Sequence, residues 1–128
     1  MAADVKDAFE RLKRDVAPDL VFTHRTADLH QDHRTVAELT WNTFRNHLIA
    51  EYEIPKYEGD LGTPNVFFDL PAAVGRRKIE LILKHFPSRA GRSWFRPETF
   101  EAVMRIRGVE CNASEGWAGR STAAEVLV

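Results

Sequence analysis

Residues 19–45, "DLVFTHRTADLHQDHRTVAELTWNTFR", decide the fold class of this chain. The stretch opens with a short apolar run, "DLVFT", whose side chains are typical of a β-strand. Its second half repeats apolar residues from Val36 to Leu48 at three- and four-residue steps, which predicts a helix that begins near His33. A strand, a polar loop and a helix in this order are typical of α/β proteins.

The rest of the chain extends this pattern. Three further helices are predicted near residues 5–16, 71–86 and 97–108, with Asp69 as the cap of the second of them and Gly108 as the stop of the last. Short strands are predicted at 66–68 and at 123–128, on either side of the last two helices. The expected fold is α/β, a partial Rossmann-like layer fold with a mostly parallel sheet flanked by helices.

Composition excludes several classes of protein. The 128 residues carry 18 basic and 19 acidic side chains, so no basic field for nucleic acid is expected. No apolar run reaches the ~20 residues that a membrane span needs, and no signal-peptide core is found, which predicts a cytoplasmic protein. The single cysteine, Cys111, excludes an intrachain disulfide and a cysteine-based zinc knuckle.

Three of the five histidines fall between residues 24 and 33, directly after the first predicted strand. Ligands of α/β sheets bind beyond the carboxyl ends of strands, which is where this loop lies. His30 and His33 are three residues apart and point to one side of a helical turn, and Asp32 could orient an imidazole. Metal binding or acid–base chemistry is one interpretation of the cluster.

The other interpretation is structural. Asp28 or Asp32 could cap the following helix, and Asp28 with Gln31 three residues later resembles a capping box. The histidines would then be polar loop residues. Spacing alone leaves both interpretations open.

A family resemblance bears on this choice. Residues 18–45 resemble the second signature of the PIG-L/LmbE-like zinc-dependent N-deacetylases, in which a strand ends in a His-x-Asp-His turn that begins a helix. The likeness continues through "YEIPKYEGDLGTPNVF" at 52–67 and through residues 76–111. It implies a hydrolase that removes an acetyl group from an N-acetylated amino sugar or a related glycoconjugate, with zinc as cofactor.

The resemblance also implies roles for particular residues. His33 would be a zinc ligand, His30 would steady the developing oxyanion or protonate the leaving amine, and Asp32 would hold His30 in position. Zinc lowers the pKa of bound water to about 7 and polarises the amide carbonyl. A separate carboxylate would then take the proton of the water.

The chain departs from the family in two respects, of which one is its ending, where Trp117 and Ala118 are kept and the sequence then diverges. The first family signature, a His-Pro-Asp-Asp-like turn with two more zinc ligands and the general base, is absent from the sequence. Residues 1–128 are therefore expected to be a single incomplete domain, the C-terminal half, with the N-terminal strands missing and without activity alone. The alternative is a non-catalytic α/β remnant or interaction module that retains the turn.

Two aromatic residues complete the set of candidates. Tyr57 in the irregular stretch after residue 51, and Trp94 among Arg89, Arg92 and Arg96, could contact a substrate, or could belong to ordinary solvated loops. The expected partner is a small amide or acetamido-sugar substrate, without nucleic acid or a membrane span. Association between copies of the chain is left open, because a sheet without its neighbouring strands exposes an edge.

Overall fold

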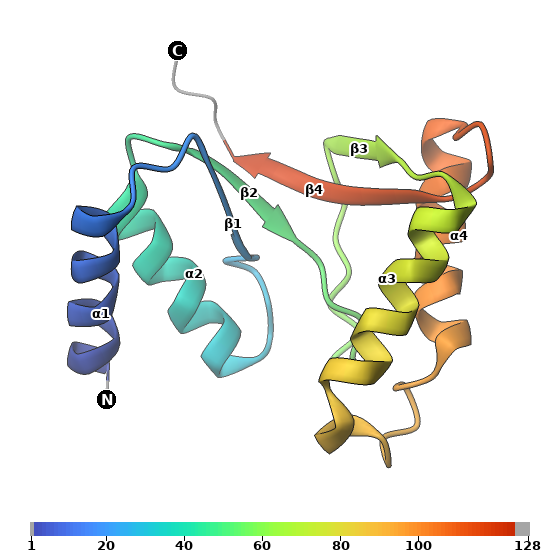
Figure 1. Cartoon of the computed structure of the whole chain (residues 1–128), viewed down its shortest axis with the longest axis horizontal. Coiled ribbons are helices and arrows are strands. Elements are labelled where there is room, and N and C mark those ends of the chain that lie inside the picture. The colour runs from blue at the N-terminus through green and yellow to red at the C-terminus, as the bar shows by residue number, and fades with distance from the viewer. Residues whose placement is uncertain (1, 125–128) are drawn as a thin grey trace. The chain divides into compact units, whose positions relative to one another are not determined.

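The computed structural model describes residues 2–124 (Figure 1). The chain falls into two compact units. Among the described residues, the first unit comprises 2–54, 60–65 and 121–124, and the second comprises 55–59 and 66–120. Within residues 2–124, no helix is long and apolar enough to cross a membrane. The expectation of one incomplete domain stays a prediction.

The first unit is built from two helices and two parallel strands, joined by the end of a later strand. Its own elements are α1 (Ala2–Asp15), β1 (Leu20–His24), α2 (Gln31–Phe44) and β2 (Leu48–Tyr52). β1 pairs with β2 in register from Leu20 opposite Leu48 to His24 opposite Tyr52. Residues 121–124 pair antiparallel with β2. The observed sheet is therefore mixed, whereas a mostly parallel sheet was expected.

Packing within this unit follows the apolar pattern of the sequence. α2 packs against β1 and β2, and α1 packs against α2, as Figure 1 shows for the blue and teal helices. Ala37 and Ile49 are fully buried, and Phe44 at the end of α2 is nearly so. The three- and four-residue steps of α2 thus place its apolar side chains against the strands.

The second unit has an apolar core between two helices. Its elements are β3 (Val66–Asp69), α3 (Ala72–His85), the short 3-10 helix η1 (Pro87–Arg89), α4 (Pro97–Cys111) and the first part of β4 (Ala118–Ala124). β4 is the neighbour of β3 as well as of β2. The core consists of Ile79, Phe95, Phe100, Met104 and Trp117.

Gly75 and Gly108 permit close packing in this core. A Cβ atom on Gly75 would lie 2.3 Å from the Trp117 ring. A Cβ atom on Gly108 would lie 2.0 Å from the carbonyl oxygen of Gly116. Gly108 therefore serves as a contact point inside α4. The helix ends three residues later at Cys111, and its C-cap Asn112 lies in the left-handed region with φ 53°.

The predicted helices are confirmed, while several boundaries differ from prediction. Leu48, placed on the helix from the apolar spacing, begins β2, and α2 ends at Phe44 with Arg45 as its C-cap. Asp69 does not cap α3; its carboxylate accepts hydrogen bonds from the Ser114 backbone amide (3.2 Å) and hydroxyl (3.1 Å). Glu115 instead accepts from the backbone amide of Ala72 at 3.1 Å. The last strand starts at Ala118, and the remainder of the segment predicted at 123–128 lies outside the described residues.

Candidate metal centre

The histidine cluster lies at the carboxyl ends of two parallel strands. His24 ends β1 and Tyr52 ends β2, and the two residues are partners in the strand register. His30 is the N-cap of α2, and His33 lies in its first turn. The loop between His24 and His30 therefore occupies the kind of crevice in which α/β sheets bind their ligands.

Among the described residues, one group of metal-ligating side chains is close enough to share an ion. Ligand atoms of His24, Asp28 and His33 all lie within 4.8 Å of one another. Asp28 is 2% exposed, and both histidines are partly buried. Two imidazoles and one carboxylate, gathered at a strand end, form a possible metal-binding triad.

Asp28 is the centre of this arrangement. One carboxylate oxygen accepts from the backbone amide of His30 at 2.8 Å, and the other lies 3.1 Å from Nδ1 of His33. The Asp28 carbonyl oxygen accepts from Arg34 at 3.0 Å. A buried carboxylate is costly unless it is hydrogen-bonded, so these contacts explain how Asp28 is tolerated here.

The hydrogen bonds hold two histidines in opposite tautomers. Because a carboxylate accepts at Nδ1 of His33, that nitrogen carries the proton, and Nε2 of His33 presents its lone pair. Nδ1 of His30 accepts from the backbone amide of Asp32 at 3.2 Å, so in the neutral ring Nε2 of His30 carries the proton. In the neutral rings, Nε2 of His33 thus offers a lone pair, and Nε2 of His30 offers an N–H group.

The three imidazoles form a stack. The His24 and His33 ring centroids are 4.0 Å apart with planes at 1°, and His30 stacks on His33 at 4.3 Å and 23°. An imidazole lone pair lies in the plane of its ring, and one ion cannot lie in two parallel stacked planes. Joint binding by His24 and His33 would therefore require one of the rings to turn.

Asp60 and Glu51 fix the loop around the cluster. The Asp60 carboxylate accepts from the backbone amide of Leu29 at 2.8 Å, and its carbonyl oxygen accepts from Arg25. Buried Glu51 accepts from the backbone amide of Thr26 at 3.3 Å and from the Trp41 indole at 2.8 Å. The loop is thus tied to residues that follow it by 31 or more positions and to β2.

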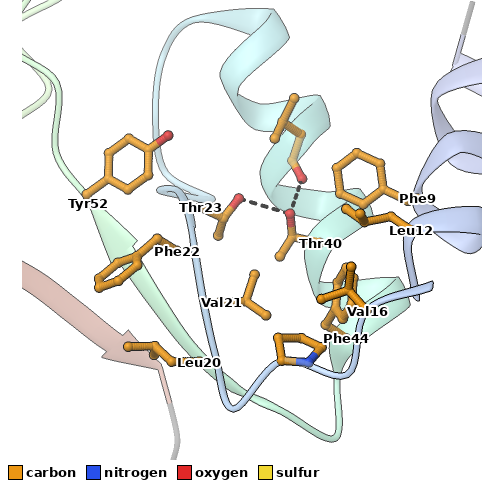
Figure 2. Close-up of a pocket in the computed structure, with 12 residues that line it drawn as sticks. Phe9, Leu12, Val16, Leu20, Val21, Phe22, Thr23, Thr40, Phe44 and Tyr52 are labelled. Carbon is orange, nitrogen blue, oxygen red and sulfur yellow. Dashed lines mark hydrogen bonds between the residues drawn. The ribbon is translucent and has the colours of Figure 1, made fainter. Parts of the chain in front are cut away.

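A groove of about 330 Å³ adjoins the cluster in the same unit (Figure 2). Apolar side chains of α1, β1 and α2 form most of its lining, and Thr23 and Thr40 are hydrogen-bonded at 3.0 Å within it. Tyr52 lines the groove, and its ring centroid is 5.0 Å from that of His24. Burial, and then the charge of Asp28, raise the pKa of Tyr52, which keeps its hydroxyl protonated.

Comparison with known proteins gives a likeness in fold. The structure is similar to the crystal structure of GalB, the 4-carboxy-2-hydroxymuconate hydratase from Pseudomonas putida KT2440, with a TM-score of 0.75 and 18% sequence identity. The match covers 98% of this chain and 60% of that one, so the chain spans about 60% of the length of the hydratase. No known protein family matches the sequence. No curated protein matches it either. At this identity the likeness shows a mixed α/β fold.

The candidates from the sequence are distributed over both units. His30 and His33 lie together in the first unit, whereas Tyr57 and Trp94 belong to the second. Asp32 is exposed, and it is its backbone amide that contacts His30, so the carboxylate expected to orient that ring is not the group that holds it.

Two members of the triad were not singled out from the sequence. The sequence predicts Asp28 only as a helix cap, and His24 only as a member of the histidine cluster. The signal that could have found Asp28 is an acidic residue between two histidines of one loop, where a carboxylate can reach a ring nitrogen.

Proposed function

We propose that this chain carries one part of a zinc-dependent hydrolytic site of the N-deacetylase type, with an N-acetylated amino sugar or a related glycoconjugate as substrate. The observation that carries the proposal is the pair of opposite tautomers. Nε2 of His33 is available to a metal, while Nε2 of His30 can donate to an oxygen or nitrogen of the substrate. A site for amide hydrolysis needs both kinds of group.

The donor set agrees with a catalytic zinc site. Such sites use three protein ligands and leave one position for water, and two histidines with one carboxylate are an established set. His33 is the first ligand in this proposal. Asp28 and His24 are the other candidates, and Asp28 could alternatively act from outside the coordination sphere by orienting His33. The same donor set also suits ferrous iron, so metal identity is part of the test.

The reaction also needs an activated water, a hydrogen-bond donor and a general base. Bound zinc would supply an activated water and polarise the amide carbonyl. The Nε2–H group of His30 would donate to the developing oxyanion or to the leaving amine. The carboxylate that takes the proton of the water would come from the His-Pro-Asp-Asp-like signature, which this sequence lacks, so the 128-residue chain is expected to be inactive alone.

The proposal places these residues in the C-terminal half of a Rossmann-like layer fold. What supports this placement is the parallel β1–β2 pair with α2 packed against it and the histidines at the strand ends. In open α/β sheets a crevice at that edge is completed by residues from several strands. A partner segment that supplied the remaining strands would therefore also supply residues to the site.

A second candidate function is hydration. The likeness to a hydratase favours water addition to an unsaturated carboxylate, a reaction that also begins with an activated water. A third candidate is a non-catalytic remnant or interaction module in which any metal binding is incidental. Metal stoichiometry separates this last candidate from the other two.

Equilibrium dialysis tests the metal site first. The purified chain should hold about one zinc, and His33→Ala should lose it while His85→Ala, on the exposed end of α3, should retain it. Manganese and ferrous iron, tested in parallel, should bind less tightly than zinc. The absence of metal binding in the wild-type chain would contradict the proposal and favour the remnant.

Two activity assays then separate the reactions. Acetate release from N-acetylglucosamine reports deacetylation, and loss of the ultraviolet absorbance of a muconate reports hydration. Neither is expected from the chain alone, and acetate release is expected once a polypeptide with the first signature is added. Hydration without deacetylation in that mixture would replace the first proposal by the second.

A further inference from the structure

A second cluster lies apart from the histidines in sequence and belongs to the second unit. Nη1 of Arg92 donates a hydrogen bond to the Tyr57 hydroxyl at 3.1 Å. The rings of Tyr57 and Trp94 are nearly perpendicular, at 85°, with centroids 6.4 Å apart. The Tyr57 and Trp94 rings thus form an aromatic corner. The Arg92 guanidinium lies at the Tyr57 hydroxyl and gives this corner a positive charge on one side.

Local structure holds each part of this corner. Tyr57 lies on a turn closed by the hydrogen bond from the amide of Gly59 to the carbonyl of Lys56 (3.2 Å). Gly59, the last residue of this turn, has a positive φ of 59°, a conformation that glycine adopts readily. Arg92 follows η1, and its amide donates to the Arg89 carbonyl at 2.9 Å. A turn and a short helix thus present the two side chains to each other.

Trp94 is anchored by the core of the unit. Its ring packs edge-on against buried Phe95 with centroids 5.8 Å apart, and Phe95 packs in the same way against buried Phe100. A continuous aromatic row therefore runs from the core to the surface. A ring supported in this way loses little conformational freedom when a ligand stacks on it.

The exposure and charge of the cluster favour a ligand over a purely structural role. Tyr57 is 63% exposed although it has a hydrogen bond and a ring contact to hold it. Arg92 donates to a neutral phenol, a contact that does not compensate its charge. The sequence 81–97 contains Lys84, Arg89, Arg92 and Arg96, and no Asp or Glu.

We propose that Tyr57, Arg92 and Trp94 form a binding site for a sugar ring that carries a carboxylate or phosphate group. The apolar face of the ring would stack on the aromatic corner, and the remaining N–H donors of Arg92 would bind the anionic oxygens. Since the Tyr57 hydroxyl accepts from Arg92, its own proton is free to point to a sugar oxygen. Binding at this site is independent of the metal; only the claim that the bound sugar is a substrate rests on the proposed function.

Calorimetric titration of the metal-free chain tests the binding site without any catalytic step. The probes are glucuronate, glucose 6-phosphate, methyl glucoside, inorganic phosphate and AMP. Both anionic sugars should bind about tenfold more tightly than methyl glucoside or inorganic phosphate. Methyl glucoside supplies only the sugar ring and phosphate only the anionic group, whereas the anionic sugars supply both. Equal binding of phosphate would reduce the site to an anion site, and tighter binding of AMP would assign it to a nucleotide; either result would overturn the proposal.

Variants identify the three residues. Arg92→Gln should weaken the anionic sugars about tenfold and leave methyl glucoside unchanged, whereas Trp94→Ala should weaken all three sugars. Tyr57→Phe retains the ring and removes only the hydroxyl. Arg76→Gln, an exposed position on α3, is the charge-matched control and should have no effect. Wild-type binding that all four variants retain, with folding verified by circular dichroism, would place the ligand elsewhere and refute the assignment.

Discussion

The two units bury different kinds of side chain. The core of the second unit is apolar, with Met104 and Trp117 among its members. The first unit buries Thr23, Asp28, Thr40 and Glu51 next to its apolar residues, and each of these four has hydrogen-bond partners. The second unit buries one charged side chain, Arg107, which pairs with Glu110 within α4. The comparison teaches that packing is the main interaction in the second unit, while the first unit also uses its interior to fix several polar groups at the candidate site.

This difference predicts which changes are costly in each unit. In the second unit, substitutions that add atoms to the core should lower the free energy of unfolding most, because close-packed interiors accommodate extra atoms poorly. In the first unit the loss of one hydrogen-bond partner should matter most, because the other partner remains buried and unsatisfied. Four predictions follow from this contrast and from the groups that the first unit buries.

The largest effect is expected for Gly108→Ala in the second unit. The new Cβ would lie 2.0 Å from the Gly116 carbonyl oxygen and 2.8 Å from the Trp117 backbone nitrogen, and backbone atoms cannot rotate away. The free energy of unfolding should fall by roughly 3 kcal/mol or more. Gly91→Ala is the matched control, because nothing lies within 4 Å of its Cβ position. Urea denaturation that gave equal stabilities for the two variants would contradict the packing of α4 described above.

The next largest effect is expected for Asp28→Asn in the first unit. The asparagine can still accept from the His30 amide, but an NH2 group facing Nδ1 of His33 makes that nitrogen an acceptor and moves the ring proton to Nε2. The ligand lone pair is then lost, and zinc affinity should fall by roughly 10- to 100-fold. Asp32→Asn, on an exposed side chain, should change zinc affinity much less. Unchanged affinity in Asp28→Asn would show that Asp28 neither orients nor binds.

A smaller effect is expected for the hydrogen-bonded pair of Thr23 and Thr40 in the groove (Figure 2). The Thr40 hydroxyl donates to the Val36 carbonyl at 2.7 Å, so the Thr23 hydroxyl must donate to Thr40. Thr40→Val leaves a buried Thr23 donor without its acceptor and should cost about 1–2 kcal/mol. Thr23→Val leaves Thr40 its bond to Val36 and should cost less. Thermal denaturation of both variants and of the double variant measures the difference; a larger loss in Thr23→Val would reverse the assigned direction.

Local sequence patterns predicted the helices well, because amphipathic spacing and prolines near helix starts act over a few residues. They failed where a contact distant in sequence decides the outcome. Gly108, predicted to stop the last helix, lies inside α4 at the point where the Gly116 carbonyl approaches it, and the role of Asp69 depends on Ser114. β2 was missed because the apolar residues from Leu48 continue the spacing of the preceding helix.

The candidate site likewise combines residues that local spacing identifies with residues whose roles depend on the folded structure. The His-x-Asp-His spacing was enough to single out His30 and His33, since both lie in one helical turn. Asp28, the centre of the arrangement, could not be identified in this way. Its contact with His33 depends on burial and on the fold of the loop, which brings the carboxylate close to the His33 ring. The contacts that fix this loop involve Asp60 and Glu51, which no local pattern connects to it.

The smallest effect concerns Tyr52, which lies between the groove and the histidines. Its pKa is raised by burial and by Asp28, so the folded chain holds the phenolic proton more tightly than the unfolded chain, whose pKa is near 10. The folded state binds more protons above that pH, and its stability must therefore fall as pH rises through this region. Urea denaturation at neutral pH and at pH values above 10 should show a steeper loss for the wild-type chain than for Tyr52→Phe, which has no proton to release. Parallel pH profiles would mean that Tyr52 reaches water more freely than its contact with His24 and its place beside the groove indicate.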